Sequence, residues 1–361
     1  MAAGKCISPI KGRGTTSTAL SPRFSNEVRT VDGDWLDECS LHETPHKLRT
    51  EVTEEIARTI LTSNDSPDIA FDRSVNAYRG CEHGCVYCYA RPTHGWLGLS
   101  PGLDFETRLY AKANAAALLR TTFSRPEYQP RLIALGTNTD PYQPIEGHYR
   151  ITRALLELML EARHPVCITT KSARIVEDLS LLARLAELGL VAATLSITTL
   201  DPVLARTLEP RASHPEKRME AVRALSTAGV PTYVNIAPVI PAITDHELES
   251  IAARAAEAGA RGISAIPLRL PHEVAPLFIE WLNLHFPGRA KRVMAIVRSL
   301  RGGRQNDAAF FSRMQGSGPW ADLLWQRVKI ARRRHRLDRK PLQWRSDLFR
   351  PPTDGRQMEL F

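Results

Sequence analysis

The stretch Cys81-Glu82-His83-Gly84-Cys85-Val86-Tyr87-Cys88-Tyr89 spaces three cysteines as C-x3-C-x2-C. Three thiolates on one short loop can bind three irons of a cubane iron–sulfur cluster. The remaining cysteines, Cys6, Cys39 and Cys167, are isolated in the sequence, so the fourth iron would keep an open position for a substrate or cofactor. The alternatives are a structural zinc loop and a set of buried thiols. Zinc sites usually complete a tetrahedron from a second cysteine pair, which this sequence lacks.

The cysteine spacing resembles the signature of the radical S-adenosylmethionine (SAM) superfamily. Tyr87 fills the aromatic position before the third cysteine, and Tyr89 after it narrows the resemblance to the spore photoproduct lyase (SplB-like) branch, often labelled DNA repair photolyases. The resemblance implies a [4Fe–4S] cluster on Cys81, Cys85 and Cys88, with SAM on the open iron and cleaved to a 5′-deoxyadenosyl radical. Packing beside the loop remains the alternative role for both tyrosines.

Length and composition fit one large α/β domain with extensions, because the chain has 361 residues with 43% hydrophobic and 24% charged residues. No apolar run is long enough to cross a bilayer, and no signal peptide follows Met1. Three of the few cysteines lie in a metal-type motif, which indicates a reducing compartment. We therefore expect a cytoplasmic protein with no membrane association.

The formal net charge of +9 and a pI near 9.4 favour a polyanionic partner, most simply nucleic acid. Basic residues crowd one C-terminal stretch: Lys329, Arg332, Arg333, Arg334, His335, Arg336, Arg339 and Lys340. Arg298, Arg301 and Arg304 form a smaller group. Guanidinium groups suit phosphate, so we expect phosphate contacts here, with a solvated helix face as the alternative.

From residue 70 onward, strand and helix patterns alternate. Apolar or β-branched runs predict strands at Ser74–Ala77, Leu132–Leu135, Val166–Thr170, Ala192–Ile197, Thr232–Val239 and Ile263–Ile266. Helical patterns lie between them, at Arg150–Arg163, from Ser172 to Gly189, from a Ser213 cap with Pro215 to Gly229, and from a Thr244–Glu247 capping box to Gly259. This rhythm predicts a parallel sheet. The resemblance implies an α/β fold of the partial (β/α)6 TIM type, and the six predicted strands agree.

Four regions follow from these patterns. We predict an N-terminal arm at 1–65, partly disordered, a radical SAM core at 66–275, a helical basic extension at 276–345 and a flexible tail at 346–361. Within the arm, Lys11–Asn26 is expected to be loosely ordered, and Leu48, Val52, Ile56 and Ile60 predict a helix over His46–Leu61.

The cysteine loop directly follows the first predicted strand, at the carboxyl edge of the sheet, where such folds place their chemistry. Polar residues follow the next strands at the same edge: Thr139, Asp140, Lys171 and Ser196. Thr139 or Asp140 could accept from an ammonium group, and Lys171 could neutralise a carboxylate. The resemblance implies that Tyr87, Lys171 and Ser196 contact SAM, and that Asp140 or Thr139 substitutes for the usual Gly-Gly-Glu, which is absent. Ordinary surface turns are the alternative.

One departure concerns the reaction. Spore photoproduct lyases carry an additional cysteine near the end of the second strand, as hydrogen donor to the substrate radical, whereas Thr137-Asn138-Thr139-Asp140 has none. The repair reaction of spore photoproduct lyases therefore cannot be assigned to this chain by resemblance. Tyr89 is the candidate catalytic residue for relay of a hydrogen atom. His83 and His94, near the cysteines, are expected to be solvated loop residues.

The last five residues, Gln357-Met358-Glu359-Leu360-Phe361, resemble the bacterial peptide that binds the DNA polymerase sliding clamp. Gln357, Met358, Leu360 and Phe361 supply its amide and apolar anchors, and a segment folded back on the domain is the alternative. The sequence thus favours a radical SAM enzyme acting on DNA, as a repair-type lyase or a modification enzyme, with flavodoxin or ferredoxin as electron donor. Two alternatives stay open: RNA, protein or a small molecule as the substrate, and a non-enzymatic Fe–S or zinc protein that binds nucleic acid and docks on the clamp.

Overall fold

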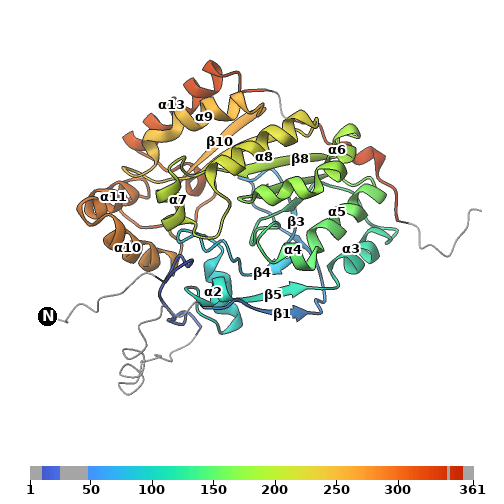
Figure 1. Cartoon of the computed structure of the whole chain (residues 1–361), viewed down its shortest axis with the longest axis horizontal. Helices are drawn as coiled ribbons and strands as arrows, with labels where there is room; N and C mark the ends of the chain where they lie inside the picture. Colours follow the sequence, from blue (N-terminus) through green and yellow to red (C-terminus); the bar gives the residue numbers. More distant parts are fainter. Residues whose placement is uncertain (1–9, 25–47, 340–341, 353–361) are drawn as a thin grey trace, which may run out of the picture.

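The computed structural model describes residues 10–24, 48–339 and 342–352, and its architecture is α/β (Figure 1). A seven-stranded sheet has the order β10-β9-β8-β7-β6-β3-β2. Within this sheet, β3, β6, β7, β8, β9 and β10 are parallel neighbours in chain order, as in a TIM-type barrel. Strand β2 (Leu61–Ser63) pairs antiparallel with β3 at the edge. The predicted α/β class and parallel sheet are confirmed.

All six predicted core strands form, with shifts of one or two residues at some ends. Their bounds are β3 Arg73–Val75, β6 Ile133–Leu135, β7 Val166–Thr170, β8 Val191–Ser196, β9 Thr232–Val239 and β10 Gly262–Pro267. Strands covered on both faces are expected to be nearly continuous apolar runs, and β6 and most of β8 are buried in this way.

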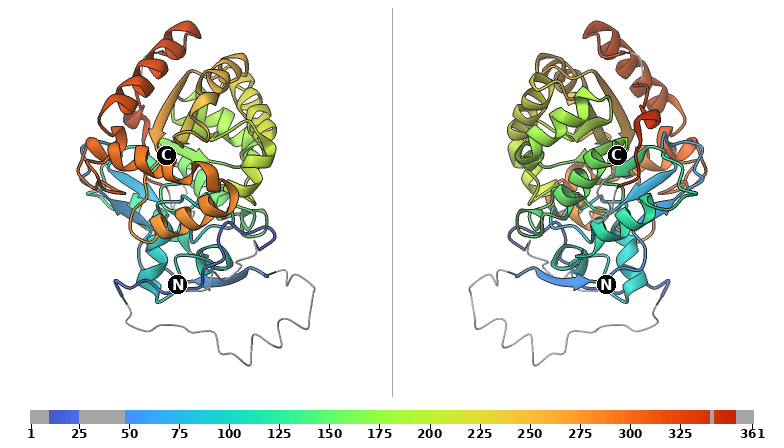
Figure 2. Two further views of the ribbon diagram at one scale, coloured as in Figure 1. Left: turned by 90° about the vertical axis from the view of Figure 1, so that its left-hand side faces the viewer. Right: turned by 90° about the vertical axis from the view of Figure 1, so that its right-hand side faces the viewer.

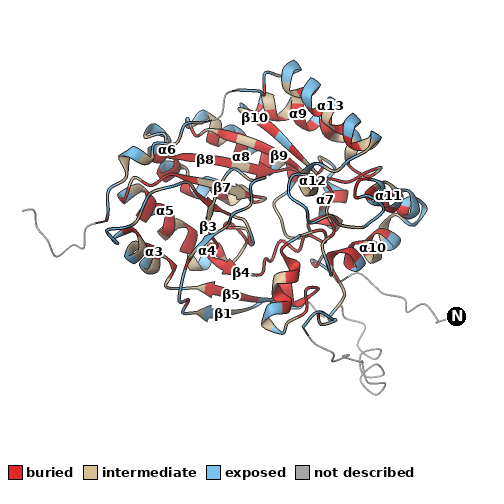
Figure 3. Cartoon of the chain, turned by 180° about the vertical axis from the view of Figure 1, so that it is seen from behind, coloured by how far each residue is buried: buried red, intermediate tan, exposed pale blue. Residues whose placement is uncertain are grey.

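The helices between the strands cover the sheet with their apolar faces (Figure 3). In α5, Leu155, Leu156 and Met159 are buried at helical spacing, as predicted. The elements of this layer are α3 Ala115–Phe123, α4 Glu146–Tyr149, α5 Ile151–Glu161, η2 Ala173–Asp178, α6 Leu179–Glu187, α7 Pro202–Leu208, α8 Pro215–Thr227, η3 Asp245–Glu247 and α9 Leu248–Glu257.

Two predicted helix caps lack their capping hydrogen bonds. His214, not Ser213, caps α8, and the Ser213 hydroxyl accepts from the Ala173 amide instead, at 2.8 Å. Thr244 stands at the N-cap of η3 as predicted, but its hydroxyl accepts from the amide of Ile240, and the Glu247 carboxylate accepts from the amide of Leu200, so the capping box does not form. Ser213 and Glu247 therefore bond segments that follow neighbouring strands rather than closing their own helices.

The predicted helix over His46–Leu61 is also wrong, since β1 (Glu51–Glu55) and β2 form there. Apolar residues four positions apart share one face of a strand as well as of a helix, so the spacing of Val52, Ile56 and Ile60 does not discriminate. Pairing decides: β1 lies parallel to β5 (Arg108–Lys112), which also pairs with β4 (Tyr78–Arg79) in a second sheet below the main one (Figure 1).

The expected loose segment Lys11–Asn26 is packed where the structure describes it, up to residue 24. Arg13 and Thr15 are buried, and the Arg13 guanidinium donates to the backbone carbonyl of Glu106 at 2.9 Å. This segment, which we call the arm (residues 10–24), therefore belongs to the folded body.

The C-terminal region adds α10 (Val274–His285), α11 (Pro287–Ser299), α12 (Ser312–Gln315), α13 (Pro319–Arg334) and η4 (Ser346–Leu348). Helices α10 and α11 share a second apolar core with Cys85, Val86 and Tyr87, and α13 packs on α9 and β10 (Figure 2). No helix in the described ranges is both long and apolar enough to span a membrane.

Two of the arginines expected at phosphate are structural instead. Arg301 is buried and donates to the carbonyls of Ser312 and Arg313, both at 2.9 Å. Arg332 donates to the carbonyl of Ile263 at 2.7 Å, which attaches α13 to β10. Both guanidinium groups are therefore engaged by backbone carbonyls of the fold.

An aromatic cluster anchors the segment after α13 at the amino edge of the sheet. Phe349 packs on Phe123, Tyr128 and His164, and the amide of Arg350 donates to a carbonyl at the end of α5. His164 precedes β7 and stacks on Phe123 at a centroid distance of 4.5 Å. The clamp-like residues Gln357, Met358, Leu360 and Phe361 lie outside the described residues, so that prediction stands as made.

Candidate active site

The loop that carries the three cysteines lies between β4 and the 3-10 helix η1 (Arg91–Leu97), at the carboxyl edge of the main sheet. Cys81 and Cys85 are buried and Cys88 is partly buried. Gly84 has a φ of +66°, and a Cβ there would lie 2.7 Å from the carboxylate of Glu106. The loop can therefore make this turn only with glycine at position 84.

A buried ion pair holds the outer side of the loop. The Arg91 guanidinium donates to the carbonyl of Cys85 at 2.8 Å and to that of Gly84 at 3.1 Å. It also pairs with Glu106, in α2 (Asp104–Thr107), at 2.6 Å, and both side chains are fully buried. A buried charged group is stable only when hydrogen bonds replace its contacts with water. Here the loop carbonyls provide these hydrogen bonds for the Arg91 guanidinium.

The arm completes this outer layer. The amide of Gly14 donates to Glu106 at 2.9 Å, and Thr15 donates to the same carboxylate at 3.3 Å. A Cβ on Gly14 would lie 1.8 Å from the carbonyl oxygen of Gly84. Arm and cysteine loop are therefore in direct backbone contact.

Residues after β6 brace the loop from the inner side. The Gln143 side chain accepts from the amide of Glu82 at 2.9 Å and donates to the carbonyl of Gly80 at 3.2 Å. Thr139 donates to the same carbonyl at 2.6 Å. Thr139 thus orients the loop, and whether it also contacts SAM remains a prediction.

Asp140 joins three elements of the rim. Its carboxylate accepts from Thr170 at 2.6 Å and from the Lys171 amide at 2.7 Å, and lies 3.3 Å from the His83 ring nitrogen. Burial works against ionisation, but His83 and these hydrogen bonds outweigh it and hold the pKa of Asp140 below its usual value. An ionised Asp140 at this place is suited to an ammonium group.

The expectation that His83 and His94 are solvated is wrong. Both are buried, and the His94 ring donates from Nε2 to the carbonyl of Arg108 at 2.9 Å. His94 stacks edge-on against Phe105, so both histidines help to pack the loop.

A second buried charge network joins Tyr87 to the strand ends. The Tyr87 hydroxyl donates to Glu209, which also accepts from Arg218, and the Lys171 amine lies 3.2 Å from the same carboxylate. Burial opposes ionisation of Glu209, but Arg218 and Lys171 outweigh it and hold the pKa of the carboxyl well below its usual range. Lys171 is thereby held at the rim, 5.5 Å from the centre of the Tyr87 ring.

The other two predicted residues differ in exposure. Ser196 ends β8 and is buried, and its carbonyl accepts from Arg218 at 2.9 Å. Tyr89 is 53% exposed, and its hydroxyl donates to the carbonyl of Thr137 after β6. Tyr89 therefore stands at the mouth of the site, between the cysteine loop and the second strand end.

The thiols fit a cluster chemically. Burial raises the pKa of all three, and for Cys81 the neighbouring Asp140 and the other two thiols raise it further. Such thiols become thiolates when a metal displaces their protons. No three His, Cys, Asp or Glu side chains among the described residues converge on one ion, whereas a cubane needs each thiolate on a different iron. Cys81, Cys85 and Cys88 would hold that cluster.

The comparisons with known proteins agree with this geometry. The model of the radical SAM superfamily matches residues 75–255, and the chain belongs to that superfamily. An uncharacterized protein of Mycobacterium tuberculosis is 37% identical over 232 residues, 64% of this chain and 68% of that protein. One of Methanocaldococcus jannaschii is 28% identical over 173 residues, 48% and 62% of the two chains.

Among solved structures, the chain resembles a cysteine-to-serine mutant of spore photoproduct lyase, at a TM-score of 0.54 and 16% identity. The match covers 86% of this chain and 84% of that one, and it shows a common fold. The chain is thus a radical SAM enzyme, and the cofactors of its family are a [4Fe–4S] cluster and SAM. Membership excludes the zinc and non-enzymatic alternatives.

The residues that sequence reasoning missed are those that brace the loop rather than line it. They are Arg13, Arg91, Glu106, Gln143, Glu209 and Arg218. Only Gln143, within the polar segment after β6, carried a usable signal. The others are single charged residues whose burial depends on contacts distant in sequence.

Proposed function

We propose that this radical SAM enzyme acts on DNA, with the reacting nucleotide placed at the mouth of the site beside Tyr89. The observation that carries the proposal is a group of exposed aromatic side chains among arginines at this mouth. We call Tyr89, Phe310 and Phe311 the aromatic rim. Exposed aromatic rings are stacking platforms for bases, and arginines beside them suit phosphate.

The contacts of Arg269 and Arg313 support this placement. Arg269, two residues after β10, lies close enough to Tyr89 and Arg313 for their charges to interact. Arg313 bonds Asp68 at 2.7 Å and lies over the Phe310 ring at 4.8 Å, and the Phe311 amide donates to the same Asp68 at 3.0 Å. The loop before α12 is thus fixed at its base, while the side chains of its two phenylalanines stay exposed.

Surface charge supports a polyanion. Lys329, Arg333 and Arg334 are exposed on α13, and no ion pair among the described residues engages them. Basic residues of this kind supply the salt-dependent, sequence-independent part of binding to nucleic acid. The fold likeness to a spore photoproduct lyase is compatible with DNA, although the absent cysteine after β6 leaves the reaction unassigned.

The roles proposed for these residues are as follows. The [4Fe–4S] cluster on the three cysteines would supply the electron for reductive cleavage of SAM. Asp140 would accept from the ammonium group of SAM, Lys171 would neutralise its carboxylate, and Ser196 would contact the same ligand. Tyr89, which is exposed and donates to the Thr137 carbonyl, would pass a hydrogen atom between cofactor and substrate.

Anaerobic reconstitution with iron and sulfide, followed by dithionite and SAM, tests the proposal. The measurement is 5′-deoxyadenosine formed without nucleic acid and with intact duplex, ultraviolet-irradiated duplex, single-stranded DNA and RNA of one sequence. We expect stimulation by DNA. Stimulation by RNA alone, or by neither, would contradict a DNA substrate while leaving the enzyme class intact.

The aromatic rim has a matched control on α13. Phe310→Ala and Phe311→Ala should each weaken binding of single-stranded DNA about fivefold to a hundredfold, because a stacked base contributes ~1–3 kcal/mol. Leu323 and Ile330 are similarly exposed apolar residues on α13, and their replacement by Ala should leave the dissociation constant unchanged. Equal losses in both pairs would remove the rim from the proposal.

A further inference from the structure

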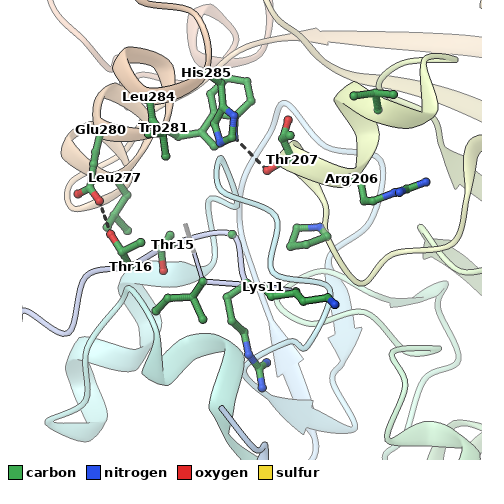
Figure 4. Close-up of a pocket in the computed structure, with 16 residues that line it drawn as sticks. Lys11, Thr15, Thr16, Arg206, Thr207, Leu277, Glu280, Trp281, Leu284 and His285 are labelled. Atoms are coloured by element: carbon green, nitrogen blue, oxygen red, sulfur yellow. Dashed lines mark hydrogen bonds between the residues drawn. The ribbon is translucent and has the colours of Figure 1, made fainter. Parts of the chain in front are cut away.

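A pocket of about 430 Å³ lies on the outer side of the cysteine loop, away from the mouth (Figure 4). The arm forms one wall, α7 and α10 form the others, and Val203, Leu277, Trp281 and Leu284 give it an apolar lining. The Trp281 indole donates to the carbonyl of Thr207 at 3.0 Å, which fixes α10 against α7. We call this cavity the arm pocket.

The floor of the arm pocket is the layer that covers the cluster loop. Gly14 and Pro210 both line the pocket, and both touch Gly84. Pro210 lies 3.2 Å from the position of a Cβ on Gly84, and a Cβ on Gly14 would lie 1.8 Å from the Gly84 carbonyl oxygen. Gly84 directly precedes Cys85, so only the backbone of the cysteine loop separates the pocket from a cluster ligand.

The rim of the arm pocket is basic on one side. Lys11 and Arg206 are exposed, point the same way in Figure 4, and form no ion pair with any acid in the described ranges. Glu280, the acidic residue of the lining, is already engaged by the hydroxyl of Thr16 on the opposite side. Val203, also in the lining, is 70% exposed. An apolar centre beside two exposed basic side chains is complementary to an acidic protein surface.

We infer that the arm pocket is the docking site of a small acidic one-electron carrier protein that reduces the cluster. The inference rests on the proposed function, since only a cluster that is reduced in each reaction needs such a partner. The carrier loses one electron and the cluster gains it, and no bond forms or breaks in that step. Substrate and SAM occupy the mouth, so the carrier approaches from the outer side, where the protein layer is thin.

Purified flavodoxin is the probe, and the double variant Lys11→Glu/Arg206→Glu is the test. The first measurement is the dissociation constant of flavodoxin at low salt, with the reconstituted protein. The second is the rate of cluster reduction followed by absorbance, with flavodoxin hydroquinone or with dithionite. We expect at least tenfold weaker binding and at least tenfold slower reduction by flavodoxin, with the dithionite rate unchanged.

Lys329→Glu/Arg333→Glu on α13 is the matched control, because it reverses two exposed charges at a distance from the arm pocket. Unchanged flavodoxin binding in the Lys11/Arg206 variant, or an equal loss in the α13 variant, would overturn the inference. Failure of dithionite to support SAM cleavage in the unmodified protein would instead count against the proposed function, so the two failures are distinguishable.

A photocrosslinker identifies the occupant directly, without relying on activity. With p-benzoylphenylalanine in place of Val203, irradiation should join the protein to flavodoxin, and 0.5 M salt should suppress the product by roughly tenfold. A crosslink that forms only within the chain, or between two copies of it, would assign the pocket to that occupant and overturn the inference.

Discussion

Gly14 and Gly84 are in backbone contact although 70 residues separate them, because neither has a side chain: a Cβ on Gly14 would lie 1.8 Å from the Gly84 carbonyl oxygen. The arm donates to the Glu106 carboxylate, the cysteine loop accepts from the Arg91 guanidinium, and these two side chains form an ion pair with each other. The shape of the loop is therefore set partly by residues that precede the whole barrel.

Gly14→Ala should displace the arm and impair assembly of the cluster, because the added methyl group overlaps a backbone atom that cannot move alone. We expect iron bound per chain after reconstitution to fall at least twofold, with little change in the far-ultraviolet circular dichroism. Gly288→Ala is the control, since nothing lies within 4 Å of a Cβ there. A Gly14 variant that binds the full iron complement would show that the arm is not needed.

Removal of the Arg91 charge should be strongly destabilising. Arg91→Met leaves Glu106 buried without its partner, and breaking a buried ion pair in this way costs about 3–5 kcal/mol. Arg79→Met, which breaks the more exposed pair with Glu55, should cost at most about 1 kcal/mol. Urea unfolding of the two variants measures both free energies, and equal values would contradict the special role of Arg91.

Lys171→Met should weaken SAM binding. A charge-assisted hydrogen bond to the SAM carboxylate contributes about 1.5–3 kcal/mol, so the dissociation constant should rise roughly tenfold to a hundredfold. Equilibrium dialysis with the reconstituted protein gives this value. Lys112→Met, which removes an amine that bonds the Asn76 carbonyl behind the loop, is the control. An unaltered dissociation constant for Lys171→Met would contradict the contact with the SAM carboxylate and would show that the Lys171 amine pairs with Glu209 alone.

Acid should destabilise the fold through His164. Burial lowers the pKa of this imidazole from 6.5 to about 4, so the unfolded chain takes up a proton at a higher pH than the folded chain. The stability is therefore complete above pH 6.5 and is lost as the pH falls toward 4, by up to about 3 kcal/mol. His164→Phe keeps the stacking and should flatten this part of the profile of unfolding free energy against pH. Parallel profiles for the two proteins would refute the assignment.

Deletion of residues 357–361 should abolish binding to a purified bacterial sliding clamp, if the resemblance of this peptide is functional. Surface plasmon resonance measures the affinity, and Leu323→Ala serves as a control that leaves the peptide intact. Unchanged affinity after the deletion would exclude the peptide as the clamp ligand.

The sequence predicted the parts of the molecule that depend on local pattern. Val166–Thr170 and Thr232–Val239 are apolar runs bounded by turns, so their strands could be placed to the residue. The cysteine spacing located the cluster loop for the same reason. The helix predicted near Val52 failed because helical and extended chains share that spacing, and only the partner strand β5 decides between them.

The bracing of the site could not be predicted, because it depends on distant partners. Glu106 pairs with Arg91, fifteen residues earlier, and accepts from the amide of Gly14, far earlier still. Glu209 likewise bonds Tyr87, Lys171 and Arg218, which come from separate elements. A charged residue without a motif is normally read as solvated, so its burial becomes visible only with the fold. Asp140, by contrast, stood at a predicted strand end and was found there.

The Phe349 anchor fixes where the chain leaves its described part. It packs beside His164, at the amino edge of the sheet, whereas the cysteine loop and the aromatic rim occupy the carboxyl edge. Gln357 follows Pro352 by five residues, at most about 18 Å of extended chain. A ligand bound by Gln357–Phe361 would therefore be held close to the amino edge of the barrel. The length of the strands would separate it from the mouth, so both edges of the barrel could be engaged at once, and each bound ligand would raise the local concentration of the other.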